Sequence, residues 1–153
     1  MVAAHLKEKG YIKEIKDAFR TILSENGGYY APPRRVTSIE AIEFLSSVGA
    51  VSVLAHPYLT FENEEAEEFL RMAVRHGLTA METRYSTYSE EINAIASSAA
   101  KKYGLLESGG SDDHGDNKPH IRLGTGMGNL SVPYEFYEKM RDFACTLHER
   151  RER

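Results

Sequence analysis

The chain has 153 residues, a length that suits one domain with a single hydrophobic core. Its 23 acidic and 19 basic residues leave a formal net charge of −4, which excludes a broad basic surface for duplex nucleic acid. The basic pairs Arg34-Arg35 and Lys101-Lys102 are isolated spots of positive charge and do not form a broad basic surface. The one cysteine, Cys145, excludes an internal disulfide and fits the reducing cytoplasm, where we expect the protein to act. No apolar run approaches the roughly 20 residues of a membrane span.

Helical spacing, capping residues and glycine stops divide the chain into alternating elements. Residues 1–36 are expected to form a helical lead-in and an extended connection, the latter over 29–35, where Pro32-Pro33 disfavours a helix. The run at 50–55 is apolar at nearly every position, which is typical of a strand buried on both faces. The expected helices cover 1–9, 12–24, 37–48, 63–75, 89–103 and 134–149, and the expected strands cover 50–55, 78–83 and 105–108.

The alternation of helices and strands in the middle of the chain predicts parallel βα units and therefore an α/β fold. We expect a partial parallel sheet flanked by helices, within one α/β domain that spans 1–153. The last predicted helix carries Cys145, which we expect to be a small, half-buried residue.

A glycine-rich segment at 109–115, Gly-Gly-Ser-Asp-Asp-His-Gly, follows the third expected strand. Asp112 and His114 stand two apart, and in extended backbone such residues project to the same side, as a shared metal site requires. His56 ends the first expected strand before Pro57, which favours extended backbone at His56. Because ligands often come from the carboxyl ends of parallel strands, these three residues predict a metal site at the rim of the sheet. Taken singly, Asp112 also fits a plain turn, and His56 fits a strand cap.

Other polar residues near the expected strand ends have structural as well as functional interpretations. Glu82 lies in the second strand and needs a partner if it is buried. Arg84, two residues later, is expected to pair with Glu82 or to meet an anionic substrate. Lys118 fits either a phosphate contact or an exposed loop. The Gly-Thr-Gly-Met-Gly run at 124–128 resembles a phosphate loop, but it neither follows a clear strand nor opens a helix, so we interpret it as a turn.

Together these motifs resemble the PHP (polymerase and histidinol phosphatase) family, in particular its metal-dependent phosphoesterases that act on nucleotides and short oligonucleotides. The resemblance implies a distorted barrel of seven βα units around three divalent metals, and hydrolysis of a phosphoester by a metal-bound hydroxide. It covers nearly the whole chain and rests on Val53-Leu54-Ala55-His56-Pro57, Gly77-Leu78 leading to Glu82, Tyr103-Gly104-Leu105-Leu106, Gly109 to Gly115, Gly128-Asn129-Leu130 and Val132-Pro133-Tyr134.

The resemblance also implies roles for single residues. The expected metal ions are Mn, Zn or Fe, since mixed imidazole and carboxylate sites accept all three. The expected catalytic pair is Asp112 and His114. The expected metal ligands are His56, Asp112 and His114, and the expected contacts of a phosphorylated small molecule or short oligonucleotide are Arg84, Lys118 and Arg34.

The chain departs from the family in three ways. None of its six histidines forms a His-x-His pair, Pro33 stands where the family usually has a basic residue, and Tyr88 stands where it often has histidine. The chain therefore corresponds to the C-terminal part of such a barrel, and three ligands cannot serve three metals. We expect it to recruit a missing N-terminal half, to form a homo-oligomer or to rearrange, because half a barrel exposes an edge strand and an apolar interior.

Two other functions stay open. A non-catalytic α/β domain derived from this fold would bind a partner protein or single-stranded nucleic acid. In that case Asp112→Ala and His114→Ala would change neither the metal content nor the function. A different, single-metal hydrolase would need another ligand, and Glu82 or His120 would then have to approach His56.

Overall fold

The computed structural model describes residues 2–29, 31 and 34–151. They divide into two units, Met1–Val36 and Thr37–Arg153, and each unit has its own hydrophobic cluster. Positions 30, 32 and 33 of the predicted extended connection lie outside the described residues. The assignment of 1–153 to one domain stays a prediction.

The first unit contains two short helices, α1 (Val2–Glu8) and α2 (Ile15–Arg20). Helix α2 is shorter than the predicted helix over 12–24. It begins after a capping box formed by Glu14 and Asp17, and turns follow its last residue. The buried cluster of this unit consists of Ala3, Ile12 and Ala18.

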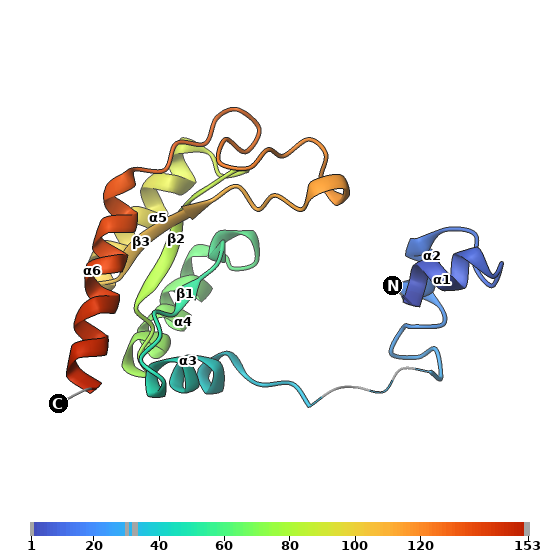
Figure 1. The fold of residues 1–153 in the computed structure, drawn as a ribbon, viewed down its shortest axis with the longest axis horizontal. Coiled ribbons are helices and arrows are strands. Elements are labelled where there is room, and N and C mark those ends of the chain that lie inside the picture. The colour runs from blue at the N-terminus through green and yellow to red at the C-terminus, as the bar shows by residue number, and fades with distance from the viewer. Residues whose placement is uncertain (1, 30, 32–33, 152–153) are drawn as a thin grey trace. The chain divides into compact units, whose positions relative to one another are not determined.

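The second unit contains a three-stranded parallel sheet with the order β1-β2-β3 (Figure 1). The strands are β1 (Val53–Leu54), β2 (Ala80–Tyr85) and β3 (Leu106–Gly110). Because successive strands are parallel, each connection must cross back over the sheet, and a helix does so in both cases. The predicted α/β fold, with a parallel sheet flanked by helices, is confirmed.

Local capping decides where the helices of the second unit begin. The Thr37 side chain accepts a hydrogen bond from the Glu40 amide, and the Glu40 side chain accepts one from the Thr37 amide, as the capping box predicts. The Ser89 hydroxyl accepts a hydrogen bond from the Ile92 amide at 3.2 Å. The helices are α3 (Ser38–Ser47), α4 (Asn63–Arg75), α5 (Glu90–Tyr103) and α6 (Tyr134–Arg151), and single 3-10 turns cover Pro57–Leu59 and Gly115–Asn117.

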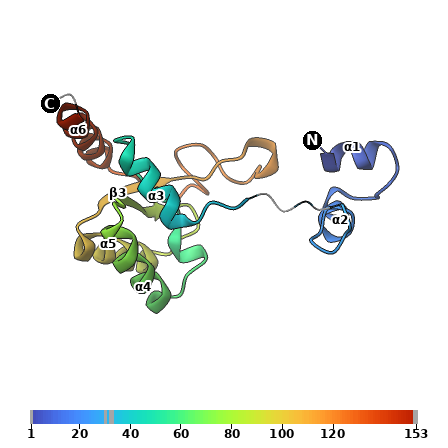
Figure 2. The same cartoon turned by 90° about the horizontal axis from the view of Figure 1, so that it is seen from below.

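The main core lies between the sheet and helices α4 and α5, which cover the same side of the sheet (Figure 2). Leu70 of α4 and Met81 of β2 are fully buried in this core. Helix α5 contributes Ala96, Ala99 and Ala100, which lie on one helix face because they are three and four residues apart. These side chains are small, so α5 can lie close to β2 and hold that strand in place.

Strand β1 departs from the prediction. It covers two residues instead of 50–55, and Val53 is 43 % exposed, so the prediction of a strand buried on both faces is wrong. Successive side chains of a strand point to opposite faces, and only Leu54 packs against the helix-covered core. Strand β1 also has one neighbouring strand only, because it forms an edge of the sheet.

Helix α6 packs along β3, the opposite edge of the sheet (Figure 1). Cys145 in this helix is exposed, so the prediction of a half-buried cysteine is wrong. A helix that packs on a single edge strand leaves most of its surface in water. Within the described part of the chain, we find no helix with both the length and the apolar character needed to cross a membrane.

We expect Leu70→Ala to lower the free energy of unfolding by about 2–5 kcal/mol, because it removes buried methyl groups and leaves a cavity. The matched control is Leu123→Ala, at a leucine that is 84 % exposed, where the change should stay within about 0.5 kcal/mol. Urea unfolding followed by circular dichroism measures both values. Equal losses at the two positions would contradict the assignment of Leu70 to the core.

Candidate metal centre

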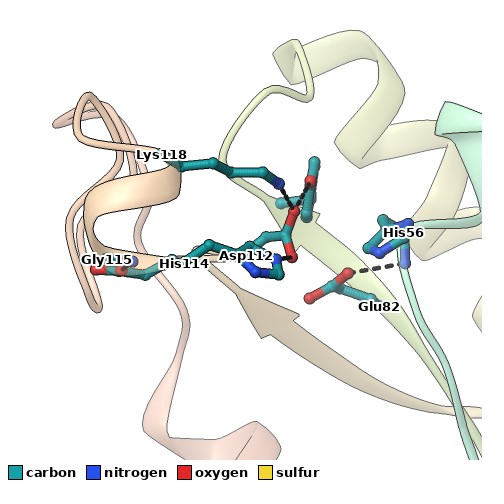
Figure 3. Close-up of polar contacts among 8 residues, drawn as sticks. His56, Glu82, Asp112, His114, Gly115 and Lys118 are labelled. Atoms are coloured by element: carbon teal, nitrogen blue, oxygen red, sulfur yellow. Dashed lines mark hydrogen bonds and ion pairs between the residues drawn. The ribbon is translucent and has the colours of Figure 1, made fainter. Parts of the chain in front are cut away.

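Candidate metal ligands come from all three strands at one edge of the sheet (Figure 3). His56 stands two residues after β1, Glu82 lies within β2, and Asp112 and His114 stand two and four residues after β3. Parallel pairing in register brings the carboxyl ends of the strands to this edge, and such edges hold the ligand sites of open α/β sheets.

Three side chains hold the Asp112 carboxylate. Tyr85 Oη donates to Asp112 Oδ2 at 2.6 Å, and Lys118 Nζ donates to the same oxygen. His114 Nε2 lies 2.9 Å from Asp112 Oδ1. The Lys118 ammonium and the Tyr85 hydroxyl hold the pKa of Asp112 well below its usual range, so this carboxylate is charged at neutral pH.

Asp112 and His114 meet through a left-handed turn. The two side chains contact each other, and their sharing of a metal site stays a prediction. The predicted extended backbone is wrong, because φ of Asp112 is +55°. Asp tolerates this region better than most residues. Between them, the Asp113 carboxylate accepts a hydrogen bond from the Gly115 amide at 2.6 Å, which closes the turn.

Glu82 fixes the backbone of His56. His56 has φ +32° and ψ +55°, a left-handed conformation that is rare outside glycine, so the extended backbone predicted before Pro57 is wrong. The His56 amide donates to Glu82 Oε2 at 2.8 Å, and this bond holds the strained residue. Burial raises the pKa of Glu82, and the bond from the His56 amide opposes that rise.

Glu82 also lies against β3. A Cβ atom at Gly110 would lie 2.5 Å from Glu82 Oε1, so a larger residue there would require the Glu82 carboxylate to move. From the central strand, Glu82 therefore contacts His56 after β1 and lies beside Gly110 of β3.

Tyr85 connects the His56 and Asp112 parts of the site, although nothing in the sequence pattern singled it out. It is 3 % exposed, and its ring centroid lies 5.1 Å from that of His56 and 5.2 Å from that of Tyr88. Burial, and then the bond to Asp112, raises the pKa of Tyr85, so its hydroxyl remains a donor. The sequence feature that could have indicated this role is a tyrosine at the end of an expected strand. A tyrosine hydroxyl that is buried there usually has a hydrogen-bond partner.

Arg84 turns toward α5. Arg84 Nη1 donates to Ser97 Oγ at 2.7 Å and to the Asn93 carbonyl at 3.3 Å. The pairing of β2 with β3 shifts between Glu82 and Arg84, so residues two apart do not share a face there. The predicted pairing of Glu82 with Arg84 is therefore wrong, and the structure does not bring Arg84 to Asp112.

Of the three predicted substrate contacts, only Lys118 reaches Asp112. Arg34 belongs to the first unit, and its role in substrate binding stays a prediction, as does that of Arg84.

The side chains at the carboxyl ends of the strands are of the types that bind divalent metals, but among the described residues too few of them lie close together to hold an ion. Imidazole and carboxylate groups bind Mn, Zn and Fe, and the Lys118 ammonium already places a positive charge on Asp112. Among residues 2–29, 31 and 34–151, however, no three His, Cys, Asp or Glu side chains lie close enough to hold one ion. The gathering of His56, Asp112 and His114 around a single ion is therefore not found in the described part of the chain, and their role as metal ligands stays a prediction.

We expect Glu82→Ala to destabilise the protein by about 1–3 kcal/mol, because the His56 amide loses its acceptor while its backbone stays strained. Glu82→Gln keeps an acceptor oxygen and should cost clearly less. Urea unfolding gives the energies, and the NMR shift of the His56 amide proton reports the bond. An unchanged His56 amide shift in Glu82→Ala would contradict the assigned bond.

A scan against models of known protein families gives no match, and a search of curated protein sequences gives none. Solved structures do match. An amidohydrolase from Chromobacterium violaceum, determined with bound sulfate and no metal, aligns at a TM-score of 0.61 with 20 % identity, over 92 % of this chain and 49 % of that chain. A Bifidobacterium adolescentis protein provisionally described as a metal-dependent phosphoesterase aligns at a TM-score of 0.63 with 25 % identity, over 92 % and 48 %. The chain thus spans about half the length of both neighbours, and its fold is consistent with that of metal-dependent hydrolases.

Proposed function

We propose that this chain carries the C-terminal part of a PHP-type metal-dependent phosphoesterase, which hydrolyses phosphoesters of nucleotides or short oligonucleotides. The observation that carries the proposal is the pair of Asp112 and His114 at the carboxyl ends of the parallel strands, which Tyr85 connects to His56. The phosphoesterase from Bifidobacterium adolescentis supports it through a shared fold over 92 % of this chain.

In this proposal Asp112 and His114 are the catalytic pair and, with His56, the metal ligands. Asp112 is charged at neutral pH, as a ligand of a hard cation must be. The imidazole of His114 offers a nitrogen donor in contact with that carboxylate. A bound divalent metal would supply charge neutralisation at the phosphoryl oxygens and would lower the pKa of water.

Lys118 is the proposed phosphate contact. Its ammonium is only partly exposed and is held by Asp112, at the position where positive charge is needed beside a phosphoryl group. A cation that binds Asp112 would repel Lys118, and the freed ammonium could then pair with a phosphate oxygen. Arg84 and Arg34 stay as proposed contacts of more distant substrate groups.

The remaining ligands of the centre would come from outside the described residues, because those residues alone do not surround an ion. The neighbours are about twice as long as this chain, which supports an additional half as their source. A second copy of this chain is the other proposed source.

One observation favours a non-catalytic domain as the second candidate. Both oxygens of Asp112 already have partners within the chain, so the carboxylate is satisfied without a metal. In that case Asp112 would stabilise the loop after β3, and the edge of the sheet would serve binding of a protein or single-stranded nucleic acid.

Binding of Mn²⁺, followed by paramagnetic broadening of NMR signals, distinguishes the two candidates. We expect Mn²⁺ to broaden the amide signals of residues 112–114 selectively, and Asp112→Asn to weaken the binding about tenfold or more. The matched control is Asp116→Asn, an exposed carboxylate in the same loop, which should leave the affinity unchanged.

Equal Mn²⁺ affinity in Asp112→Asn and Asp116→Asn, or no selective broadening in the unchanged chain, would contradict the phosphoesterase proposal. Either result would favour the non-catalytic domain.

A further inference from the structure

We propose that the first unit, Met1–Val36, carries a binding surface for single-stranded nucleic acid, whereas the candidate metal centre belongs to the second unit. The surface consists of exposed cations and aromatic rings in the segment that runs from the end of α1 through α2 (Figure 1). The inference goes beyond the proposed hydrolysis, because it concerns binding alone and requires no metal.

Positive charge is concentrated in the first unit. Residues 1–36 contain seven lysines and arginines and four acidic residues, which gives a net charge of +3. The whole chain carries −4, so the remaining 117 residues carry −7. Such an asymmetry between two parts of one chain indicates that the basic part binds an anionic partner.

The cations of this unit are available for a partner, because its acidic side chains are already engaged. Each acidic side chain accepts a hydrogen bond from a neighbour in the same unit: Glu8 from His5, Glu14 from Lys7, Asp17 from the Glu14 amide and Glu25 from Arg35. In the part of the chain that the structure describes, Lys9, Lys13, Lys16 and Arg20 are exposed and have no acidic partner. These four groups therefore remain to neutralise phosphates.

Aromatic rings alternate with these cations along the chain. Tyr11 stands between Lys9 and Lys13, and Phe19 stands between Lys16 and Arg20. Tyr11 is 72 % exposed and Phe19 is 62 % exposed, so both rings are accessible from water. A single strand can stack its bases on such rings while its phosphates meet the cations.

Helix α2 holds part of this surface in a fixed arrangement. Ala18, on its inner face, is fully buried in the small cluster that joins α2 to α1. Ile15 and Phe19 stand four residues apart and form one exposed stripe, and Lys16 and Arg20 form the next stripe. A cationic stripe beside an apolar one suits a strand that presents phosphates on one side and bases on the other.

Two tyrosines also line an apolar groove of about 370 Å³ in this unit. Tyr11 and Tyr29 are 72 % and 81 % exposed. The other lining residues are aliphatic: Val2, Leu6, Ile22 and Leu23. This volume falls within the range of about 300–1,000 Å³ that is usual for small-molecule sites, so the groove offers apolar walls and two rings to an inserted base.

A single strand suits this surface better than a duplex or a membrane. The bases of a duplex stack on one another, so they are not available to the exposed rings. A helix at a membrane surface buries a long apolar face, whereas α2 covers six residues and presents only Ile15 and Phe19.

Fluorescence anisotropy of a labelled oligothymidylate of about twelve nucleotides measures binding to the full chain, with EDTA present so that no metal takes part. We expect log K to fall with log salt concentration at a slope of about −2.8, because each of four cations contributes about −0.7. Lys16→Gln combined with Arg20→Gln should bring the slope to about −1.4 and weaken binding about tenfold or more at low salt. The matched control combines Arg71→Gln with Arg75→Gln, exposed residues with the same spacing on α4, and should bind as the unchanged chain does.

The contribution of stacking is measured with the same strand. Phe19→Ser should weaken binding about fivefold or more, because a base loses the ring on which it stacks. The matched control is Phe44→Ser on α3, where the ring is 65 % exposed and binding should not change. Tyr11→Ser should also weaken binding, whereas Tyr11→Phe keeps the ring and should bind as the unchanged chain does.

Equal affinity and equal salt slope in the α2 double variant and its α4 control would overturn the proposal. It is also overturned by a duplex of the same length that binds as tightly as the single strand, or by adsorption to phosphatidylserine vesicles without strand binding. Because EDTA excludes Mn²⁺, strand binding at the first unit and Mn²⁺ binding at Asp112 succeed or fail independently, which separates this inference from the proposed hydrolysis.

Discussion

The constraint on which the site depends is the parallel pairing of three successive strands. Parallel strands end at the same edge, so residues that are more than 50 positions apart along the chain become neighbours there. The central strand controls this edge. Glu82 accepts a hydrogen bond from the His56 amide, which holds the segment after β1, and its carboxylate lies beside Gly110 of β3.

Charge balance is the second feature of the edge. The charged Asp112 carboxylate is partly buried, and a buried charge needs partners. Lys118, Tyr85 and His114 supply them within the chain. The same partners keep the carboxylate oriented in the absence of any cation, which makes Asp112 a prepared ligand in the proposed phosphoesterase. They also explain how the loop after β3 can be stable in a protein that does not use a metal.

Strand β1, the outer strand on one side of the sheet, is exposed, and this exposure is consistent with the proposal that a second half of the barrel packs against the chain. Helices cover one face of the sheet, whereas Val53 on the other face of β1 is 43 % exposed. An edge strand with free backbone groups and an exposed apolar side chain can pair with further chain. Of the candidate ligands, only His56 follows this edge strand, whereas Asp112 and His114 follow β3 on the opposite side of the sheet. Within the described residues these side chains do not surround an ion.

The sequence by itself determined the features that depend on neighbouring residues. Capping boxes and glycine stops located α3, α4 and α5, because a helix end is satisfied by residues within one turn. The alternation of elements determined the parallel sheet. The contact of Asp112 with His114 depends on a left-handed turn at Asp112, which the two-residue spacing did not predict. Only the tertiary structure decided the turn of Arg84 away from Glu82, the exposure of Cys145 and Val53, and the role of Tyr85. These depend on a register shift, on which faces other elements cover and on a partner 27 residues away, and none of them is encoded by local spacing.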